Sequence, residues 1–355
     1  MKKLNVAIIG QGRSGKDIHG TYFRSENNKY YNVKYVVEFE KHRREIAEKI
    51  FPGCVTLEKY TELFDKDVDL IVNASYSDMH YPITKDLLLH GKNVLVEKPL
   101  GRNRFECEDL IKVAKDCGVV LAVFQNSTTA PYCIHAKKLM KDGVFGEVKQ
   151  ISIRFNGFSR RWDWQTLQKK MGGSVYNIGP HPIGLALEFL DYDDNIKVEY
   201  SRLDKCITSG DAEDYAKIIL SAPNKPLVDI EINSVDPYSD YNVKIQGTKG
   251  GMKSTTRTYV YKYLDWKDFP PRPLIEESLR DKDDNPIYCN EELKFTEEEG
   301  KYPGTAFDIG TATIYENVYN VINGKEELIV KPRDISKLIG IIEKVHADNY
   351  MEREF

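Results

Sequence analysis

One stretch near the start of the chain predicts the fold of its first half: Leu4-Asn5-Val6-Ala7-Ile8-Ile9 followed by Gly10-Gln11-Gly12-Arg13-Ser14-Gly15. The apolar run predicts a buried strand, and the glycines follow with G-x-G-x-x-G spacing before a predicted helix, Ser14 to Arg24. In such a loop the glycines allow, in order, a tight turn, close approach to a pyrophosphate and close helix–strand packing. The helix N-terminus offers N–H groups to phosphates. Taken alone, the stretch could also be a glycine-rich turn without a ligand.

The residues that follow alternate between strand-like and helical patterns. This alternation predicts right-handed crossovers and a parallel, doubly wound α/β sheet. With the phosphate loop first, five strands make a dinucleotide-binding domain, which we place at residues 1–126. The later predicted strands are Val33 to Val37, Val68 to Ala74, Val94 to Val96 and Val119 to Phe124, and the helices are Tyr81 to Leu89 and Arg104 to Cys117.

An acid stands at the end of the second predicted strand. Glu38 lies near the spacing at which a carboxylate accepts hydrogen bonds from the adenosine ribose and repels a 2′-phosphate. NAD is therefore favoured, with NADP possible. The basic side chains of His42, Arg43 and Arg44 could weaken that preference, or they could cover a solvated helix face.

A second polar group follows the strand Val94 to Val96. Glu97-Lys98-Pro99 stands at its carboxyl end, where open α/β sheets bind their ligands. The Lys98-Pro99 bond could be cis, which would fix the direction of the lysine. The alternative is that Lys98 is a solvated loop lysine.

Composition excludes several classes of protein. The chain has 355 residues, is 41% hydrophobic and 30% charged, and carries a net charge of −4. This predicts two soluble domains and gives no sign of a nucleic-acid or membrane surface. The apolar run after Met1-Lys2-Lys3 is too short for a signal peptide. The six cysteines are scattered without a C-x-x-C pair, which indicates reduced thiols in the cytoplasm, with no disulfide framework and no metal site.

From Glu147 onward the pattern changes to alternation with a period of two. It predicts a mainly antiparallel sheet with one covered face. The other face, where tyrosines alternating with apolar residues would favour a partner subunit, is expected to be solvated or buried in a homodimer or homotetramer. Residues 127–355 therefore form a second, α+β domain, in which residues 265–303 are a long loop or arm. The predicted strands are Val148 to Phe155, Ile196 to Leu203, Tyr215 to Ser221, Leu227 to Val235, Tyr241 to Gly247 and Tyr259 to Leu264, with turns that include Gly250-Gly251. The predicted helices are Pro131 to Asp142, Thr305 to Ile322 and Arg333 to His346, and the last ones could pack back toward the first domain.

Three segments of the first half carry a family resemblance. Beside the glycine loop, Ala74-Ser75-Tyr76-Ser77-Asp78-Met79-His80 is similar to A-T-P-N-x-x-H, with departures at Tyr76 and Ser77. Gly91-Lys92-Asn93-Val94 running into Glu97-Lys98-Pro99 is similar to G-K-H-V followed by E-K-P. With these segments the chain resembles the glucose-fructose oxidoreductase / inositol dehydrogenase / MocA family of NAD(P)-dependent oxidoreductases.

The resemblance implies a Rossmann domain followed by a larger open-faced sheet domain, with Lys98 beside the nicotinamide and the substrate hydroxyl. The cofactor-binding residues that it implies are Gly10, Gln11, Gly12, Arg13, Ser14, Gly15, Glu38, Ala74, Ser75, Tyr76, His80, Glu97, Lys98 and Gln125.

A fourth segment, Gly172 to Gly184, resembles the family pattern G-G-x-x-x-D-x-G-x-H-x-x-D, whose aspartate and histidine face the substrate. His181 is present, but Asn177 and Gly184 replace the two aspartates. His181 could act as a general base or merely cap the helix that runs to Leu190. Asn177 can orient His181 or a sugar hydroxyl, but it cannot stabilise an imidazolium as a carboxylate would.

Trp162-Asp163-Trp164 lies in the loop before that segment, preceded by Arg160 and Arg161. Aromatic faces stack on sugar or inositol rings, so this loop could be a substrate lid. It could equally be a buried or interfacial tryptophan pair.

These residues predict reversible oxidation of a secondary alcohol on a sugar, sugar derivative or cyclitol. Lys98, His181 and Asn177 are the candidate catalytic residues, and Trp162 and Trp164 join them in binding substrate. The hydride passes to NAD, His181 takes the hydroxyl proton, and Lys98 stabilises the developing alkoxide. A nucleotide-bound sugar sensor and an NAD-dependent glycosidase using transient oxidation remain as alternatives.

Overall fold

The first sheet is parallel and carries the glycine loop at its centre. The structure is a computed structural model and describes residues 2–355. The strand order β3-β2-β1-β4-β5-β6 places a topological switch point between β1 and β4. The sequence predicts five of these strands, whereas the three residues of β3 are too few to show a periodic pattern. The strands are β1 (Leu4–Ile9), β2 (Tyr31–Val37), β3 (Val55–Leu57), β4 (Leu70–Asn73), β5 (Val94–Glu97) and β6 (Leu121–Phe124).

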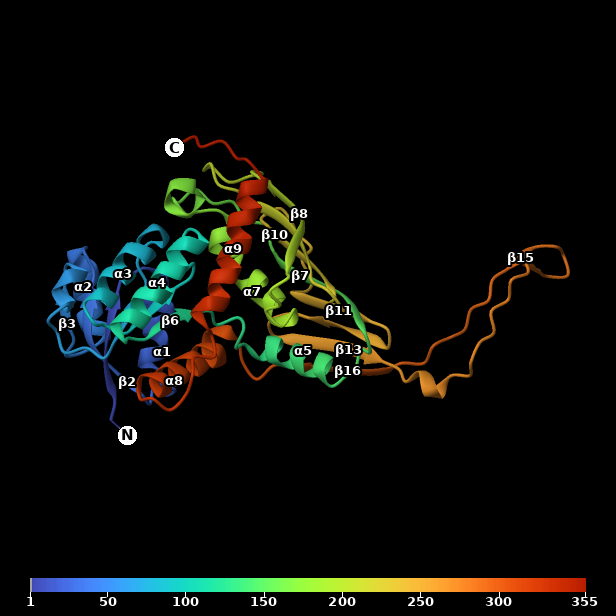
Figure 1. Cartoon of the computed structure of the whole chain (residues 1–355), viewed down its shortest axis with the longest axis horizontal. Helices are drawn as coiled ribbons and strands as arrows, with labels where there is room; N and C mark the ends of the chain where they lie inside the picture. Colours follow the sequence, from blue (N-terminus) through green and yellow to red (C-terminus); the bar gives the residue numbers. More distant parts are fainter. Residues whose placement is uncertain (1) are drawn as a thin grey trace.

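Helices cover this sheet, so β4, β5 and β6 are buried at every residue (Figure 1). Local signals set the ends of α4: the side chain of Asn103 accepts a hydrogen bond from Glu106 N, and Gly118 follows with φ +66°. The helix predicted from Ser14 begins instead as a π-helical turn, Arg13–His19, and continues as α1. The helices are α1 (Gly20–Arg24), α2 (Lys41–Ile50), α3 (His80–Leu89) and α4 (Arg104–Cys117).

The second sheet confirms the mainly antiparallel, open-faced architecture. Its order is β16-β13-β12-β11-β7-β10-β9-β8, and only β7 and β10 pair in parallel. Gly250-Gly251 was expected to be a turn, but it begins β12, where a Cβ on Gly250 would lie 2.1 Å from Lys262 O. The strands are β7 (Val148–Asn156), β8 (Lys197–Asp204), β9 (Tyr215–Ser221), β10 (Leu227–Asn233), β11 (Val243–Gly247), β12 (Gly250–Ser254), β13 (Thr258–Tyr263) and β16 (Thr296–Lys301).

The tyrosines of β13 do not lie on the open face of this sheet. Tyr259 and Tyr261 face α5 (Pro131–Lys141), where the ring of His135 packs against both. The expectation of tyrosines on the uncovered face is wrong here, because the period of two fixes which residues share a face but not which face is covered. The open face carries ion pairs instead: Asp229 lies 2.7 Å from Arg154 Nη2 and 2.6 Å from Lys217 Nζ.

The last two helices return to the first sheet. On α8 (Thr311–Ile322), Tyr315 is fully buried beside Tyr22, with which it stacks at 4.3 Å between ring centroids. α9 (Pro332–Asp348) lies between the two sheets and contacts α4, β8 and α7 (Pro180–Phe189) (Figure 1). The boundary placed at residue 126 falls in the connection between β6 and α5.

Residues 265–303 contain less loop than expected, because residues 296–301 form β16 at the edge of the second sheet. Alternation is hidden there by a run of glutamates. The rest of the segment projects far from the body as a long arm with the short strands β14 (Leu279–Arg280) and β15 (Pro286–Ile287) (Figure 1).

Candidate active site

The glycine loop has the geometry that a pyrophosphate site needs. Gly10 has φ +91°, and a Cβ there would lie 2.4 Å from Ala74 O, so only glycine fits between β1 and β4. A Cβ on Gly15 would lie 1.9 Å from Gly10 O, whereas one on Gly12 would meet nothing within 4 Å. The open side of Gly12 therefore leaves room for a phosphate against the backbone, and the loop fits a dinucleotide.

Glu38 lies directly beside that loop. Its buried Oε2 accepts a hydrogen bond from Gln11 N at 2.9 Å, and Oε1 accepts one from Glu40 N at 3.1 Å. Arg43 Nη1 lies 3.9 Å from the carboxylate, whereas Arg44 binds the backbone oxygen of Glu38. Arg43 is therefore the basic residue placed to compete with Glu38 for a ribose or its phosphate.

Glu97 is the centre of a buried polar cluster. It accepts hydrogen bonds from Ser14 Oγ, from Lys98 N at 3.1 Å and from His19 Nε2 at 3.1 Å. His19 Nδ1 in turn lies 2.8 Å from the hydroxyl of Tyr315 on α8. Burial by itself would raise the pKa of Glu97, but the bonds and charges of His19 and Lys98 reverse this and lower it to about 2.

Neither His19 nor Tyr315 was predicted from the sequence. A lone histidine in a helix and a tyrosine near the end of the chain carry no local signal for a site. The cluster ties the glycine loop, the end of β5 and α8 together, so it holds the backbone from which Lys98 projects.

The segment after β4 is also fixed from within. Buried His80 lies with Nδ1 2.7 Å from Pro99 O and Nε2 3.2 Å from Ser75 O. Ser75 Oγ donates to Asn73 Oδ1 at 2.7 Å. Burial lowers the pKa of His80. Its ring thus joins the Ala74–Tyr76 segment to the loop after β5, and we expect it to influence a cofactor through those backbones.

Lys98 crosses from the first domain to the second. The Lys98-Pro99 bond is cis, as the sequence suggested, and Nζ donates to the backbone oxygen of Asn177 at 2.7 Å. Asn177 ends the short helix α6 (Ser174–Asn177), and its side-chain oxygen accepts from Gln165 Nε2 at 3.0 Å. Burial and then the charges of Arg13 and Arg161 lower the pKa of Lys98, although Glu97 acts against them. The lysine is half-buried with partners from both domains, unlike a solvated loop lysine.

His181 stands in the first turn of α7. Its Nδ1 lies 3.2 Å from Ser127 Oγ, and its ring stacks on Phe155 with 6.3 Å between centroids. Burial, followed by the charge of Lys98, lowers the pKa of His181 to about 3. The lowered direction is the one expected for a histidine that has Asn177 in place of a carboxylate. Within residues 2–355 no hydrogen bond uses Nε2, which leaves that nitrogen for a hydroxyl.

Gln125 explains why residue 184 is glycine. Its Nε2 donates to Pro180 O and to Ser127 Oγ, while its buried Oε1 has no partner within the described chain. A Cβ on Gly184 would lie 2.6 Å from Gln125 Nε2. A side chain at residue 184 would therefore require the amide of Gln125 to shift.

The tryptophan segment divides into an exposed part and a docked part. Trp162 is 76% exposed, whereas Trp164 packs edge-on against Tyr76 with 5.0 Å between centroids. Lys170 Nζ adds an ion pair to Asp78 at 2.9 Å, so the segment bridges the two domains. The tryptophans are not a buried pair.

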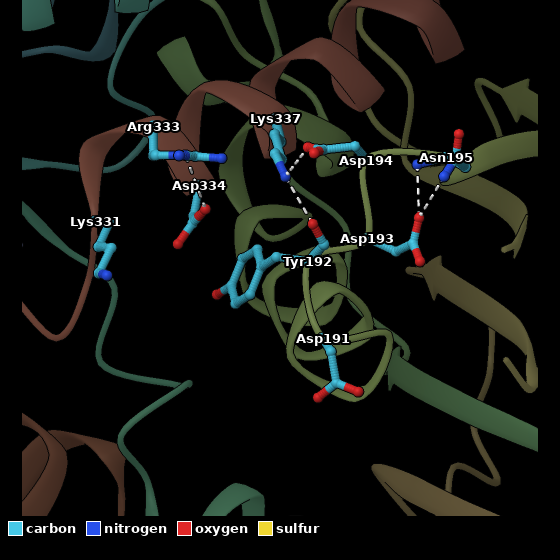
Figure 2. Close-up of a pocket in the computed structure, with 9 residues that line it drawn as sticks. All are labelled: Asp191, Tyr192, Asp193, Asp194, Asn195, Lys331, Arg333, Asp334 and Lys337. Carbon is cyan, nitrogen blue, oxygen red and sulfur yellow. Dashed lines mark hydrogen bonds and ion pairs between the residues drawn. The ribbon is translucent and has the colours of Figure 1, made fainter.

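A separate surface hollow of about 640 Å³ lies where the loop 191–195 meets the start of α9 (Figure 2). Lys337 Nζ lies between Tyr192 O at 2.6 Å and Asp194 Oδ1 at 2.5 Å. None of the predicted site residues lines this hollow, and its charges are paired, Lys337 with Asp194 inside it and Asp191 with Lys225 outside it, so we do not place the active site there.

Residues 2–355 show neither a metal site nor a membrane-spanning helix. No group of three or more His, Cys, Asp or Glu is arranged to hold a metal ion. In the same residues we find no helix that is long and apolar enough to cross a bilayer.

Comparison with known proteins assigns both halves of the chain. Residues 4–125 match the model described as oxidoreductase family, NAD-binding Rossmann fold. Residues 133–253 match the GFO/IDH/MocA C-terminal domain.

Among curated relatives, uncharacterized oxidoreductase C115.03 of Schizosaccharomyces pombe is 25% identical over 70% of each chain. The scyllo-inositol 2-dehydrogenase (NADP(+)) IolW of Bacillus subtilis is 25% identical over 52% of this chain and 51% of its own. The dTDP-3,4-didehydro-2,6-dideoxy-alpha-D-glucose 3-reductase of Streptomyces antibioticus is 33% identical over 40% of this chain and 44% of its own length.

Two solved structures share the whole fold. An NAD-binding protein from Listeria innocua superposes with a TM-score of 0.78 at 22% identity, covering 98% of both chains. GenD2 from gentamicin A biosynthesis, in complex with NAD, also superposes with a TM-score of 0.78. Its sequence is 19% identical, and the superposition covers 98% of this chain and 95% of the GenD2 chain. The chain belongs to the GFO/IDH/MocA family of oxidoreductases with an NAD-binding Rossmann fold.

Proposed function

We propose that this protein transfers a hydride reversibly between NAD(P) and a secondary alcohol of a sugar, sugar derivative or cyclitol. The bond from Lys98 Nζ to the backbone oxygen of Asn177 supports this most directly. This bond brings Lys98, at the end of β5, to the segment that carries His181. The positive charge of Lys98 and the base His181 can therefore contact the same substrate hydroxyl between the domains.

The residues divide the chemistry between them. When bound, the nicotinamide cofactor supplies or accepts the hydride. His181 has a pKa lowered to about 3, so at neutral pH it is unprotonated and can take the hydroxyl proton at Nε2. Lys98 provides a positive charge for the alkoxide that develops as the proton leaves. The side-chain amide of Asn177, itself held by Gln165, is on the same segment and is proposed to bind a substrate hydroxyl.

The substrate class rests on relatives and on side-chain chemistry. One relative carries the name of an inositol dehydrogenase and another that of a nucleotide-sugar reductase. Exposed Trp162 and the paired amides of Gln165 and Asn177 offer a ring face and hydroxyl partners, which suits a polyol.

For the coenzyme, we propose a preference for NAD. Glu38 is fixed by Gln11 N at the position where a ribose hydroxyl would bind, and its charge repels a 2′-phosphate. Titration of both reduced coenzymes should give a lower dissociation constant for NADH. Equal affinity would mean that Arg43, 3.9 Å from the carboxylate, dominates.

NADH formation across a panel of sugars, sugar derivatives and cyclitols tests the proposed reaction. We expect net NADH with at least one member and none with the Lys98→Met variant. Lys92→Met, at the other end of the same strand, is the matched control. Coenzyme binding without any turnover would indicate the sensor function, and product without net NADH would indicate transient oxidation.

We further propose that the protein is cytoplasmic, because its six cysteines are free thiols. We also propose that it forms a homodimer or homotetramer through the open face of the second sheet. The half-buried ion pairs of Arg154 and Lys217 with Asp229 give that face a patterned, polar surface for a second copy.

A further inference from the structure

Most of the arm formed by residues 269–295 lies away from the body of the protein, and at its root Leu293 and Phe295 line a groove of the second sheet. It leaves the second sheet at β13, projects into solvent and returns to β16 (Figure 1). Leu274 is 86% exposed and Tyr288 is 82% exposed, with Ile275 and Ile287 also in solvent. Apolar groups of this size on an extended hairpin indicate a surface that another molecule covers.

The arm is acidic. Residues 269–295 contain seven Asp or Glu and four Lys or Arg, a net charge of −3. Both arginines are neutralised within the arm, since Arg272 pairs with Glu291 at 2.7 Å and Arg280 with Asp284 at 3.5 Å. Glu276 and Glu277 are among the carboxylates left to solvent.

A basic groove lies at the root of the arm, on the open side of β11, β12 and β13. Its charged residues are four lysines and one acid, Lys244, Lys249, Lys253, Lys262 and Glu297. Trp266 and Phe295 form an apolar wall beside them, and Lys262 Nζ lies 5.2 Å from the centre of the Phe295 ring.

The register of the sheet concentrates this positive charge. Lys244 on β11 is directly opposite Lys253 on β12, and like charges facing each other across strands are unfavourable. Lys253 has one partner, Asp240 at 2.6 Å, while Lys244 is exposed. Acidic groups from outside this sheet would relieve the repulsion.

We propose that the arm of one molecule binds the lysine groove of a second copy of this chain, and that the exchange is reciprocal. The arm carries −3 and the charged residues of the groove +3, and both present apolar side chains next to their charges. Because each chain has one arm and one groove, a twofold axis satisfies both at once. This inference rests on the proposed self-association and assigns the contact that holds the two copies together. We call this contact, the arm of one copy in the lysine groove of the other, the clasp.

The length of the arm suits such an exchange. A hairpin of 27 residues has about 13 in each direction, which reach at most about 45 Å when extended. The groove lies at the arm's own root, so the exchange requires two chains whose second sheets face each other and whose arm roots lie within the length of one arm.

Sedimentation and light scattering on the full chain test the clasp. Lys244→Glu/Lys253→Glu and Glu276→Lys/Glu277→Lys should each weaken association about tenfold or more, because each places like charges in contact. An equimolar mixture of the two variants should recover the wild-type association constant, since each acidic groove then meets a basic arm. Lys115→Glu/Lys325→Glu, two exposed lysines elsewhere, is the control and should associate normally.

A second variant does not depend on charge reversal. Tyr263 and Thr296 are paired in register, so β13 and β16 can stay paired when Asn-Gly replaces residues 269–293 and a short connection of 264–268, Asn-Gly and 294–295 remains. This variant should keep its unfolding temperature and lose association. A wild-type chain that is monomeric overturns both the proposed self-association and the clasp. Normal association of the arm variants, or no recovery on mixing, overturns the clasp alone. NADH formation, followed in parallel, tests the proposed reaction separately.

Discussion

The two sides of the candidate active site are held in different ways. On the cofactor side, Glu97 is buried and bonded to His19 and Ser14, and Tyr315 closes the cluster from another helix. On the substrate side, Trp162 is 76% exposed and the pair of Arg161 with Asp163 lies at the surface. The cofactor side is thus fixed by buried, charge-assisted bonds, and the substrate side mostly by partly exposed contacts.

This difference partly matches where the sequence keeps and loses the family pattern. The glycine loop and Glu97-Lys98-Pro99 agree with the pattern, whereas Asn177 and Gly184 depart from it. The cofactor side also departs at Tyr76 and Ser77, and the substrate side keeps His181. A chemistry common to many substrates needs one fixed geometry, while recognition of a particular substrate can change with a few side chains. The following predictions test this contrast, from the largest effect to the smallest.

Lys98→Met should lower kcat by roughly 10³-fold or more, because it removes the only positive charge proposed for the alkoxide. Coenzyme affinity, measured by fluorescence titration, should stay near that of the wild type. Turnover close to that of Lys92→Met would return Lys98 to the role of a loop lysine.

Glu97→Gln should lower the free energy of unfolding by about 2–4 kcal/mol, since charge-assisted bonds to His19 and Ser14 are lost inside the protein. Urea unfolding measures this. Because the folded pKa of Glu97 is lowered to about 2, the stabilisation is complete above the ordinary carboxyl pKa and is lost progressively as the pH falls from there to about 2. The difference in free energy of unfolding between Glu97→Gln and the wild type should therefore become smaller at acidic pH.

Glu108→Gln on α4 is the control for that measurement. Its carboxylate pairs with Arg104 at 2.6 Å on the surface, where such a pair contributes about 0–1 kcal/mol. An equal loss in the two variants would contradict the proposed difference between the buried and exposed sides.

Asn177→Asp should raise the pKa of His181 by about one unit or more, because a nearby anion favours imidazolium. In the wild type that pKa is lowered to about 3, so alcohol oxidation should be nearly independent of pH around neutrality. The acidic limb of the rate profile should move to higher pH in the variant and be absent in His181→Ala. A lower rate with an unmoved limb would reassign the proton to Lys98 or to water.

The two tryptophans should give the smallest effects, and of different kinds. Trp162→Ala should raise KM several-fold without changing stability, if its exposed ring covers the substrate. Trp164→Ala should lower stability by about 1 kcal/mol through loss of its contact with Tyr76. A reversal of the two results would mean that Trp162 is the structural residue.

Much of the fold could be predicted from local pattern. β1, the glycine loop and the strand–helix alternation up to β6 were predicted from residues close together in sequence, and Lys98-Pro99 was recognised only as a bond that could be cis. β3 and β16 could not be predicted from the sequence. β3 is only three residues long, and β16, Thr296–Lys301, is almost wholly polar. An edge strand needs only backbone pairing, which leaves no hydrophobic period in its sequence.

Local sequence is enough to predict the dinucleotide loop, the acid after β2 and the lysine after β5, because backbone conformation and strand order place those groups. The partners of these groups come from distant parts of the chain and depend on how it packs. Lys98 reaches the backbone oxygen of Asn177, and His19 reaches Glu97 on one side and Tyr315 on the other. These partners lie tens to hundreds of residues apart, and no local pattern records such contacts. They form because burial inside a folded core makes an unpaired polar group costly, so each finds a partner wherever the chain returns.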